Sequence, residues 1–255
     1  MKAVRAIAIN TFKEAIRNKI LYSLIFFAFV MMLVSLVLDH ATVGQRNKII
    51  KDLGLGSINL FGVVIAIVVG INLVYQEIQK RTIYPLLAKP VRRAQFLVGK
   101  YLGIVLTLFV ETLLMSLFLF MLVLVYEGAV DFYLSLALFM IFVELAVVSA
   151  VAIFFSSFST PFLSGMFTFA VYVIGHLSTY LKQFGHDSES LVLKQMTAFF
   201  YYILPNLERF NWKAAAVYHL PVENTKLLLT VFYGLIYIAT IIILSVLSFE
   251  RRDFK

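Results

Sequence analysis

Long apolar runs alternate with short polar segments along the whole chain. The runs occupy Ile20–Leu38, Ile58–Tyr75, Phe96–Val125, Phe132–Phe155, Phe162–Leu181 and Leu227–Phe249. Each is close to or above the length that a helix needs to cross the hydrocarbon core, about 20 residues. Because the bilayer core offers backbone amides no water, such runs must form helices. The pattern predicts an all-α integral membrane protein with six transmembrane helices.

The polar residues before the first run suggest a further helix over residues 1–19. At helical spacing, one arc gathers the apolar side chains, and the opposite side gathers Asn10, Lys13, Glu14, Arg17 and Asn18. A helix of this kind lies at the membrane surface with its cations toward anionic lipid. We therefore expect an N-terminal interfacial amphipathic helix. The alternative is a basic flank that only fixes topology.

The segments between the runs predict how the spans are connected. Residues 39–57 read as a polar outer segment with a turn at Gly54 and Gly56, and the short stretch 126–131 predicts an antiparallel helical hairpin. Pro161 suits the first turn of the fifth span. Leu191–Ile203, at 13 residues, is too short to cross a bilayer. It is expected to form a helix in the outer segment between the fifth and sixth spans, with a seventh span as the alternative.

Composition and charge narrow the class of protein. The 255 residues are 62% hydrophobic and 14% charged, which leaves room for one membrane domain, residues 1–255, and no soluble one. Cysteine is absent, which excludes disulfides and thiolate metal sites. The net charge of +8 is concentrated in the segments that are inner if the N-terminus is cytoplasmic. This positive-inside bias favours cytoplasmic N- and C-termini and a membrane-surface role for the charge, not nucleic-acid binding.

One basic segment, residues 76–100, joins the second and third runs. Its sequence, QEIQKRTIYPLLAKPVRRAQFLVGK, places Ile83, Leu86 and Leu87 at helical spacing among charged residues. An apolar stripe inside a charged rim is what a protein docking element needs. A positively charged topology anchor is the simpler interpretation, and composition alone favours it.

The order of residues in this segment resembles the first inner loop of the permease subunits of type-2 ATP-binding-cassette (ABC) exporters. That loop typically contains a glutamate, a basic–threonine pair, leucines, Lys-Pro or Arg-Pro, an arginine, a phenylalanine and Gly-Lys. The matching residues here are Glu77, Arg81, Thr82, Leu86, Leu87, Lys89, Pro90, Arg92 or Arg93, Phe96, Gly99 and Lys100. Where the family often has glycine before the threonine, this chain has Arg81. Leu204–Asn211 and the ending Phe249–Phe254 also resemble the family, so the resemblance covers the whole chain.

The resemblance implies a permease subunit in the plasma membrane, the inner membrane of a bacterium. Two permease copies, identical or different, would pair and dock on two ABC ATPase subunits, with Glu77–Arg93 as the coupling helix. ATP and Mg²⁺ would bind the ATPase, and this chain would bind no cofactor. The sequence contains no G-x-x-x-x-G-K-[ST] phosphate loop, which agrees with a separate ATPase.

Two carboxylates lie inside predicted spans, where an ionised group is costly and a functional role is the default hypothesis. Glu111 lies 17 residues before Gly128 and Glu144 lies 16 residues after it. At about 1.5 Å per residue the two differ in depth by only about 1.5 Å. They are candidates for polar contact between helices, sharing a proton if they face each other, or for a place in the translocation pathway. No lysine or arginine occupies the same depth in another span, so no ion pair is expected. His176 is expected to form an interhelical hydrogen bond.

Other functions remain open from the sequence. A stand-alone secondary transporter would use Glu111 and Glu144 as a proton relay, and a non-transporting membrane assembly subunit would use neither. An enzyme is not expected, because the chain shows no catalytic nucleophile–base arrangement and no metal-binding cluster. Nothing in the sequence selects a cargo.

Overall fold

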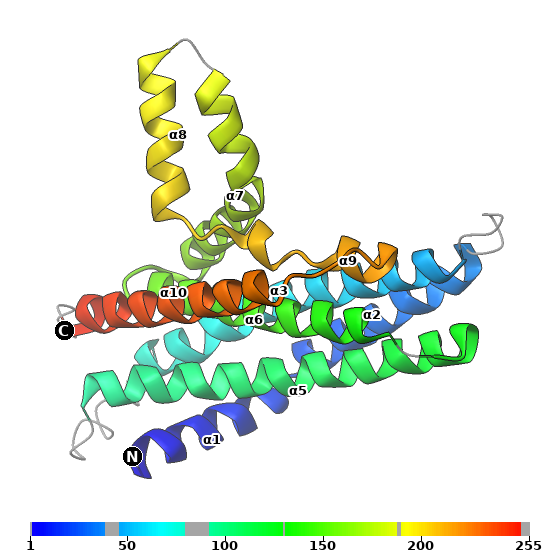
Figure 1. Ribbon diagram of the computed structural model, residues 1–255. Helices are drawn as coiled ribbons and strands as arrows, with labels where there is room; N and C mark the ends of the chain where they lie inside the picture. Colours follow the sequence, from blue (N-terminus) through cyan, green and yellow to red (C-terminus); the bar gives the residue numbers. More distant parts are fainter. Residues whose placement is uncertain (1, 39–45, 80–91, 130, 188–189, 251–255) are drawn as a thin grey trace.

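A computed structural model describes residues 2–38, 46–79, 92–129, 131–187 and 190–250 (Figure 1). These residues form helices and no strands, in the order α1 (Lys2–Ile16), α2 (Lys19–Leu38), α3 (Arg46–Gln79), α5 (Arg93–Glu127), α6 (Phe132–Ser156), α7 (Pro161–Asp187), α8 (Leu191–Ile203), η2 (Leu207–Phe210), α9 (Lys213–Tyr218) and α10 (Asn224–Glu250). Six of them, α2, α3, α5, α6, α7 and α10, are long and apolar enough to cross a membrane. The predicted all-α membrane fold with six spans is confirmed.

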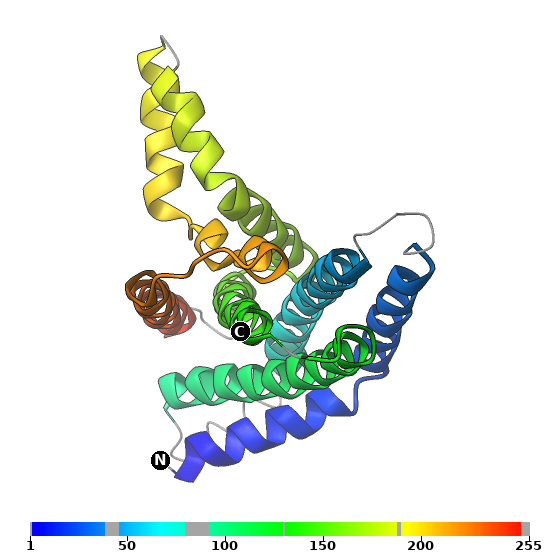
Figure 2. The ribbon, with the colours of Figure 1, turned by 45° about the vertical axis from the view of Figure 1, so that its right-hand side comes forward.

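Helix α6 lies at the centre of the bundle. It is enclosed by α3, α5, α7 and α10 (Figure 2). Glycines make the contact with α3 close, because a Cβ on Gly62 would lie 2.6 Å from Leu145 Cδ1 and one on Gly70 would lie 2.9 Å from Ala152 Cβ. The small residues thus let two spans pack backbone against backbone, as is typical of helix contacts in membranes.

The connections on either side of α6 follow the sequence prediction. Gly128, in the left-handed conformation with φ 73°, ends α5 and donates its N–H to Leu124 O. Asp131 begins α6 by accepting a hydrogen bond from the Tyr133 N–H at 3.2 Å. The antiparallel α5–α6 hairpin is therefore confirmed, and α7 begins at Pro161 as expected.

The prediction that residues 39–57 form a polar outer segment with a turn is wrong for the second half of this range. Helix α3 begins at Arg46 and includes both glycines that suggested a turn. Gly54 faces α5, where an added Cβ would lie within 3.2 Å of three Leu119 side-chain atoms, and Lys51 pairs with Glu127 at 2.9 Å. Because these residues pack against α5, tertiary contact extends the helix beyond the apolar run.

The predicted N-terminal helix forms, and it packs lengthwise along the first half of α5 (Figure 1). A Cβ on Gly103 would lie 2.6 Å from the Ala8 carbonyl oxygen, and one on Gly99 would lie 2.8 Å from Ile7 Cβ. The sequence placed Glu14 on the polar side of this helix, but it pairs with the buried Lys100 of α5 at 3.6 Å. A contact between α1 and lipid headgroups stays a prediction.

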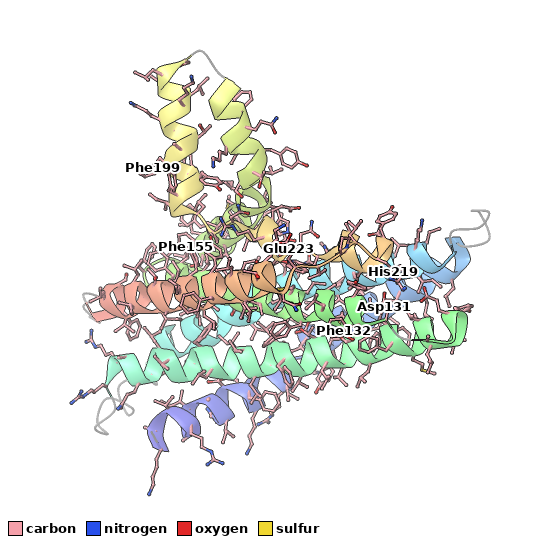
Figure 3. The ribbon with its side chains drawn as sticks, in the orientation of Figure 1. Asp131, Phe132, Phe155, Phe199, His219 and Glu223 are labelled. Carbon is pink, nitrogen blue, oxygen red and sulfur yellow. The ribbon has the colours of Figure 1, made fainter. Side chains whose placement is uncertain are left out.

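The end of α7 and the whole of α8 lie side by side and project away from the other spans (Figures 1 and 2). Helix α8 has the bounds predicted for the short outer helix, and Gly185 of α7 packs against Thr197 of α8. Most of its apolar side chains are exposed, including Phe199, which Figure 3 labels. Helix α8 leads into η2 and α9, which return the chain to α3 and α6.

Candidate functional site

The predicted coupling segment is described only at its ends. Arg81, Thr82, Leu86, Leu87, Lys89 and Pro90 lie outside the described residues, and Glu77 lies in α3 with its side chain outside them. Arg92 and Arg93 are described, and they mark the start of α5. The backbone N–H of Arg92 donates to Gln95 Oε1 at 3.3 Å, and the Arg92 side chain is exposed.

Arg93 connects the start of α5 to the end of α10. Its Nη1 donates to the carbonyl oxygen of Phe249 at 3.1 Å. One turn further on, the rings of Phe96 and Phe249 stack with their centroids 6.1 Å apart. Together with α1, which covers Gly99 and Gly103, these contacts hold the first turns of α5 between the two ends of the chain.

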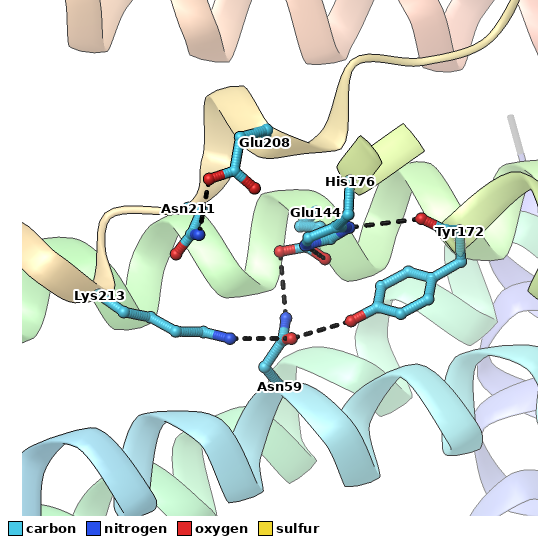
Figure 4. A network of polar contacts seen from close by, with 7 residues as sticks. All are labelled: Asn59, Glu144, Tyr172, His176, Glu208, Asn211 and Lys213. Carbon is cyan, nitrogen blue, oxygen red and sulfur yellow. Dashed lines mark hydrogen bonds and ion pairs between the residues drawn. The ribbon is translucent and has the colours of Figure 1, made fainter. Parts of the chain in front are cut away.

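A polar network surrounds Glu144 in the interior of the bundle (Figure 4). Asn59 of α3 donates from Nδ2 to Glu144 Oε2 at 3.1 Å, and the Asn59 Oδ1 accepts from the hydroxyl of Tyr172 at 3.0 Å and from the ammonium of Lys213 at 3.1 Å. Asn59 and Glu144 are 3% and 1% exposed. The network therefore joins α3, α6, α7 and α9 through one buried amide.

His176 adds an ionisable group to this network, as an interhelical partner of Glu144. Its Nε2 lies 3.5 Å from Glu144 Oε1, and its Nδ1 lies 3.4 Å from the backbone carbonyl of Tyr172. A neutral imidazole has one N–H and cannot donate to two acceptors. Both contacts become favourable in two cases. In the first, the imidazole is protonated on both nitrogens and donates to both acceptors. In the second, Glu144 is protonated and donates to Nε2, while the Nδ1–H donates to the carbonyl of Tyr172.

Lys213 brings a cation close to Glu144, which the sequence analysis did not predict. It is the first residue of α9, outside the six spans, and its side chain reaches inward to Asn59. The sequence analysis considered only lysines and arginines within spans, so it did not include this residue. Burial lowers the pKa of the Lys213 ammonium, and the charges of Glu144, Asp52 and Glu208 partly oppose this by raising it.

Segments around α9 hold this lysine in place. Phe210 and Leu207 of η2 are buried against the bundle, and the Asn206 N–H donates to the Tyr233 hydroxyl at 2.9 Å. Beyond α9, His219 pairs with Asp131 at the start of α6, with Nδ1 and Oδ2 2.7 Å apart (Figure 3). Contacts with α6 and α10 therefore position Lys213 beside Asn59.

Glu111 has a different environment from Glu144. Its side chain is 2% exposed, and neither carboxylate oxygen has a hydrogen-bond partner among the described residues. Among the described residues, no hydrogen bond or ion pair joins Glu111 to Glu144. The two acids are thus not partners, and Glu144 instead contacts Asn59 of α3 and His176 of α7.

The sequence pattern that defines the ABC-2 family transporter proteins matches residues 5–254, nearly the whole chain. The chain belongs to this family. It is thus a multi-pass membrane permease component of an ABC transporter, in a family that binds no cofactor itself and works in general with an ABC ATPase. No match was found among curated proteins.

Sequence reasoning missed three members of the permease's polar network: Asn59, Tyr172 and Lys213. Asn59 left a signal, because an amide within an otherwise apolar run needs a hydrogen-bonding partner inside the membrane. Lys213 follows the segment Leu204–Asn211, which was noted only for its resemblance to the family. The pairing itself left no trace in the sequence, because the residues are separated by up to 154 positions.

Proposed function

We propose that this permease belongs to an ATP-driven exporter and that residues 77–93 couple it to its ATPase, with Glu77, Arg81, Thr82, Leu86, Leu87, Lys89, Pro90, Arg92 and Arg93 at the contact. The observation that supports this most is the continuity of α5. The helix begins at Arg93, at the end of the proposed coupling segment, and runs without a break for 35 residues to Glu127. At 1.5 Å per residue it is about 50 Å long, more than the hydrocarbon core.

A helix of this length carries a movement from one end of the bundle to the other. At its start α5 is held by Phe249 of α10 and by Glu14 of α1, so displacement of the coupling segment moves all three helices. At its far end Glu127 pairs with Lys51 of α3. Nucleotide-driven closure of the ATPase would thus reach the opposite membrane surface through packed helices rather than through a flexible linker.

The same proposal places the chain in the plasma membrane, the inner membrane of a bacterium, with both termini in the cytoplasm. A second permease copy, identical or different, completes the pathway, and ATP and Mg²⁺ bind the ATPase. The apolar side chains exposed on α7 and α10 supply surface for lipid and for this second copy. The positive-inside distribution of charge supports the orientation.

The orientation is tested with single cysteines, because the chain has none of its own. Ser159→Cys lies in the α6–α7 turn, and Glu223→Cys lies before α10 on an exposed side chain (Figure 3). A membrane-impermeant maleimide added to intact cells should label Glu223→Cys and leave Ser159→Cys unlabelled. Labelling of Ser159→Cys alone would reverse the orientation and remove the coupling proposal.

The ATPase is sought by purifying the tagged permease from its native membranes. An ABC ATPase should co-purify and hydrolyse ATP, whereas the separated permease should hydrolyse none.

Arg92→Glu should then lower permease-dependent ATP hydrolysis severalfold without changing the thermal unfolding midpoint, because Arg92 is exposed. Lys194→Glu, a charge reversal at an exposed lysine of α8, is the matched control. Equal hydrolysis by both variants would contradict the coupling role.

The Glu144–His176 contact favours one alternative, a secondary transporter that moves protons. Against it, α3, α5 and α6 are continuous helices, whereas such transporters typically build their sites from broken half-helices. Glu111→Gln combined with Glu144→Gln in sealed vesicles separates the two functions. Loss of proton flux in the absence of ATP would establish the alternative.

A further inference from the structure

The side chain of Lys213 reaches into the interior of the bundle, although the residue does not belong to a span. It begins a helix of only 6 residues, and its side chain extends from that helix to Asn59, between α3 and α6 (Figure 4). The Lys213 side chain thus fills its contact site as a ligand would, while it stays covalently attached to the protein. The groups that receive it therefore define what kind of ligand fits there.

The orientation of the Asn59 amide is fixed by its partners. Its Nδ2 donates to Glu144 Oε2, and its Oδ1 accepts from both the Tyr172 hydroxyl and the Lys213 ammonium. The reversed amide would point its N–H groups at the ammonium and its oxygen at the carboxylate, and both contacts would be repulsive. The buried site thus presents an acceptor toward the cation, with a carboxylate directly behind it.

The electrostatic environment also favours a cation. Glu144 is fully enclosed, and its Oε1 accepts no hydrogen bond among the described residues, although His176 Nε2 lies 3.5 Å away. Asp52 and Glu208 add negative charge near the Lys213 ammonium. A desolvated ammonium is favoured only where acceptors and negative charge replace its water, and this site supplies both.

We propose that Asn59, Glu144 and Tyr172 form a binding site for one primary ammonium group, and that Lys213 fills this site in the present conformation. An external amine competes with Lys213 for the same acceptors and fills them when the lysine side chain is absent. The site belongs to the permease itself, so the inference stands whether or not residues 77–93 couple to an ATPase.

The test removes the tethered ammonium and returns it as a free molecule. Lys213→Ala deletes three methylenes and the ammonium, a volume that n-propylammonium matches. The thermal unfolding midpoint of the full-length permease is measured in detergent against increasing n-propylammonium chloride, with tetramethylammonium chloride at equal ionic strength as the control. Emission from Trp212, the only tryptophan and the neighbour of Lys213, reports on the same site.

We expect n-propylammonium to raise the midpoint of Lys213→Ala in a saturable way, with half the effect on the order of 1–10 mM for so small a ligand. Tetramethylammonium, which has no N–H, should not. The wild-type protein and the double variant Lys213→Ala, Glu144→Gln should show no saturable rise. No shift in Lys213→Ala, or an equal shift with tetramethylammonium, would overturn the proposal.

A second variant keeps the test decisive if Lys213→Ala does not fold. Lys213→Cys carries the only cysteine in the chain and is alkylated in the membrane before extraction. Reaction with 2-bromoethylamine produces a side chain of the same length as lysine, ending in a primary ammonium. Reaction with (2-bromoethyl)trimethylammonium produces the same charge without N–H donors. Recovery of the wild-type midpoint with the first reagent only supports the site, and equal recovery with both rejects it.

Discussion

Helices α6 and α10 are nearly equal in length and hydropathy, yet they occupy opposite positions in the bundle. In the most apolar 18-residue stretch of α6, 89% is buried inside the protein, whereas in that of α10 only 17% is buried. In water such a difference would be visible as an amphipathic pattern, because the exposed face would be polar. In a membrane, lipid and protein interior are equally apolar, so hydropathy finds a span without telling where it packs.

What distinguishes the two helices is the placement of small and polar residues. The contacts of α6 with α3 involve Gly62, Gly70 and Ala152, and it carries the buried Glu144. Helix α10 instead presents large side chains such as Leu229 and Phe232 outward. Substitutions at the contacts of α3, α5 and α6 should therefore have large effects, and the same changes on α10 small ones.

The largest effect is expected for Ala152→Leu, which inserts a branched side chain opposite Gly70. Overpacking of a tight contact should lower the free energy of unfolding by about 3 kcal/mol. Ala239→Leu makes the same change at an exposed position of α10 and should alter it by less than about 0.5 kcal/mol. Thermal unfolding midpoints in detergent compare the two. Equal losses would show that α10 is packed as tightly as α6.

Ion pairs should show the same contrast. Lys51→Met leaves Glu127 without its partner at the α3–α5 contact, where Lys51 is only 3% exposed. The loss should be about 2 kcal/mol, below that of a fully buried pair because Glu127 retains some solvent contact. Lys226→Met breaks an exposed pair between α10 and Glu223, the residue before this helix, and should change stability by less than about 0.5 kcal/mol. Urea unfolding in mixed micelles measures both, and a larger loss for Lys226→Met would contradict the comparison.

The two buried acids sharpen the comparison within the interior. Glu144→Gln replaces the acid that faces His176 and lies behind Asn59, and should destabilise the protein by about 1–2 kcal/mol. Glu111→Gln removes a carboxylate that has no hydrogen-bond partner in the described structure, so stability should stay the same or rise slightly. Thermal midpoints at constant pH test this, with Trp212 emission as a local probe. A loss at Glu111 as large as at Glu144 would mean that Glu111 has an equally important partner.

The smallest individual effects are expected for two glycine substitutions. Gly103→Ala places a Cβ 2.6 Å from the Ala8 carbonyl oxygen, so α1 must move away from α5, and stability should fall by about 1 kcal/mol after the gain in helix propensity. Gly56→Ala in α3 meets nothing within 4 Å and should raise stability by up to about 1 kcal/mol. Limited proteolysis near residue 17 should also accelerate in Gly103→Ala only.

Local features of this fold were readable from the sequence. The hairpin at Gly128, the start of α7 at Pro161 and the bounds of α8 depend on neighbouring residues and were predicted correctly. The start of α3 was not, because Gly54 reads locally as a turn, whereas the packing of Gly54 on Leu119 and the Lys51–Glu127 pair hold this stretch against α5. Of the candidate site, the sequence indicated Glu144 and His176 but neither Asn59 nor Lys213.

By itself, the sequence determined that the chain crosses a membrane six times, because a bilayer permits only self-satisfied helices over long apolar runs. It also determined the family, through residue order along the whole chain. Only the tertiary structure decided which span lies at the centre and which acid acquires partners. Those outcomes depend on close approach between residues that are distant in the sequence. Hydropathy does not decide them, because lipid and the protein interior are equally apolar surroundings for a helix.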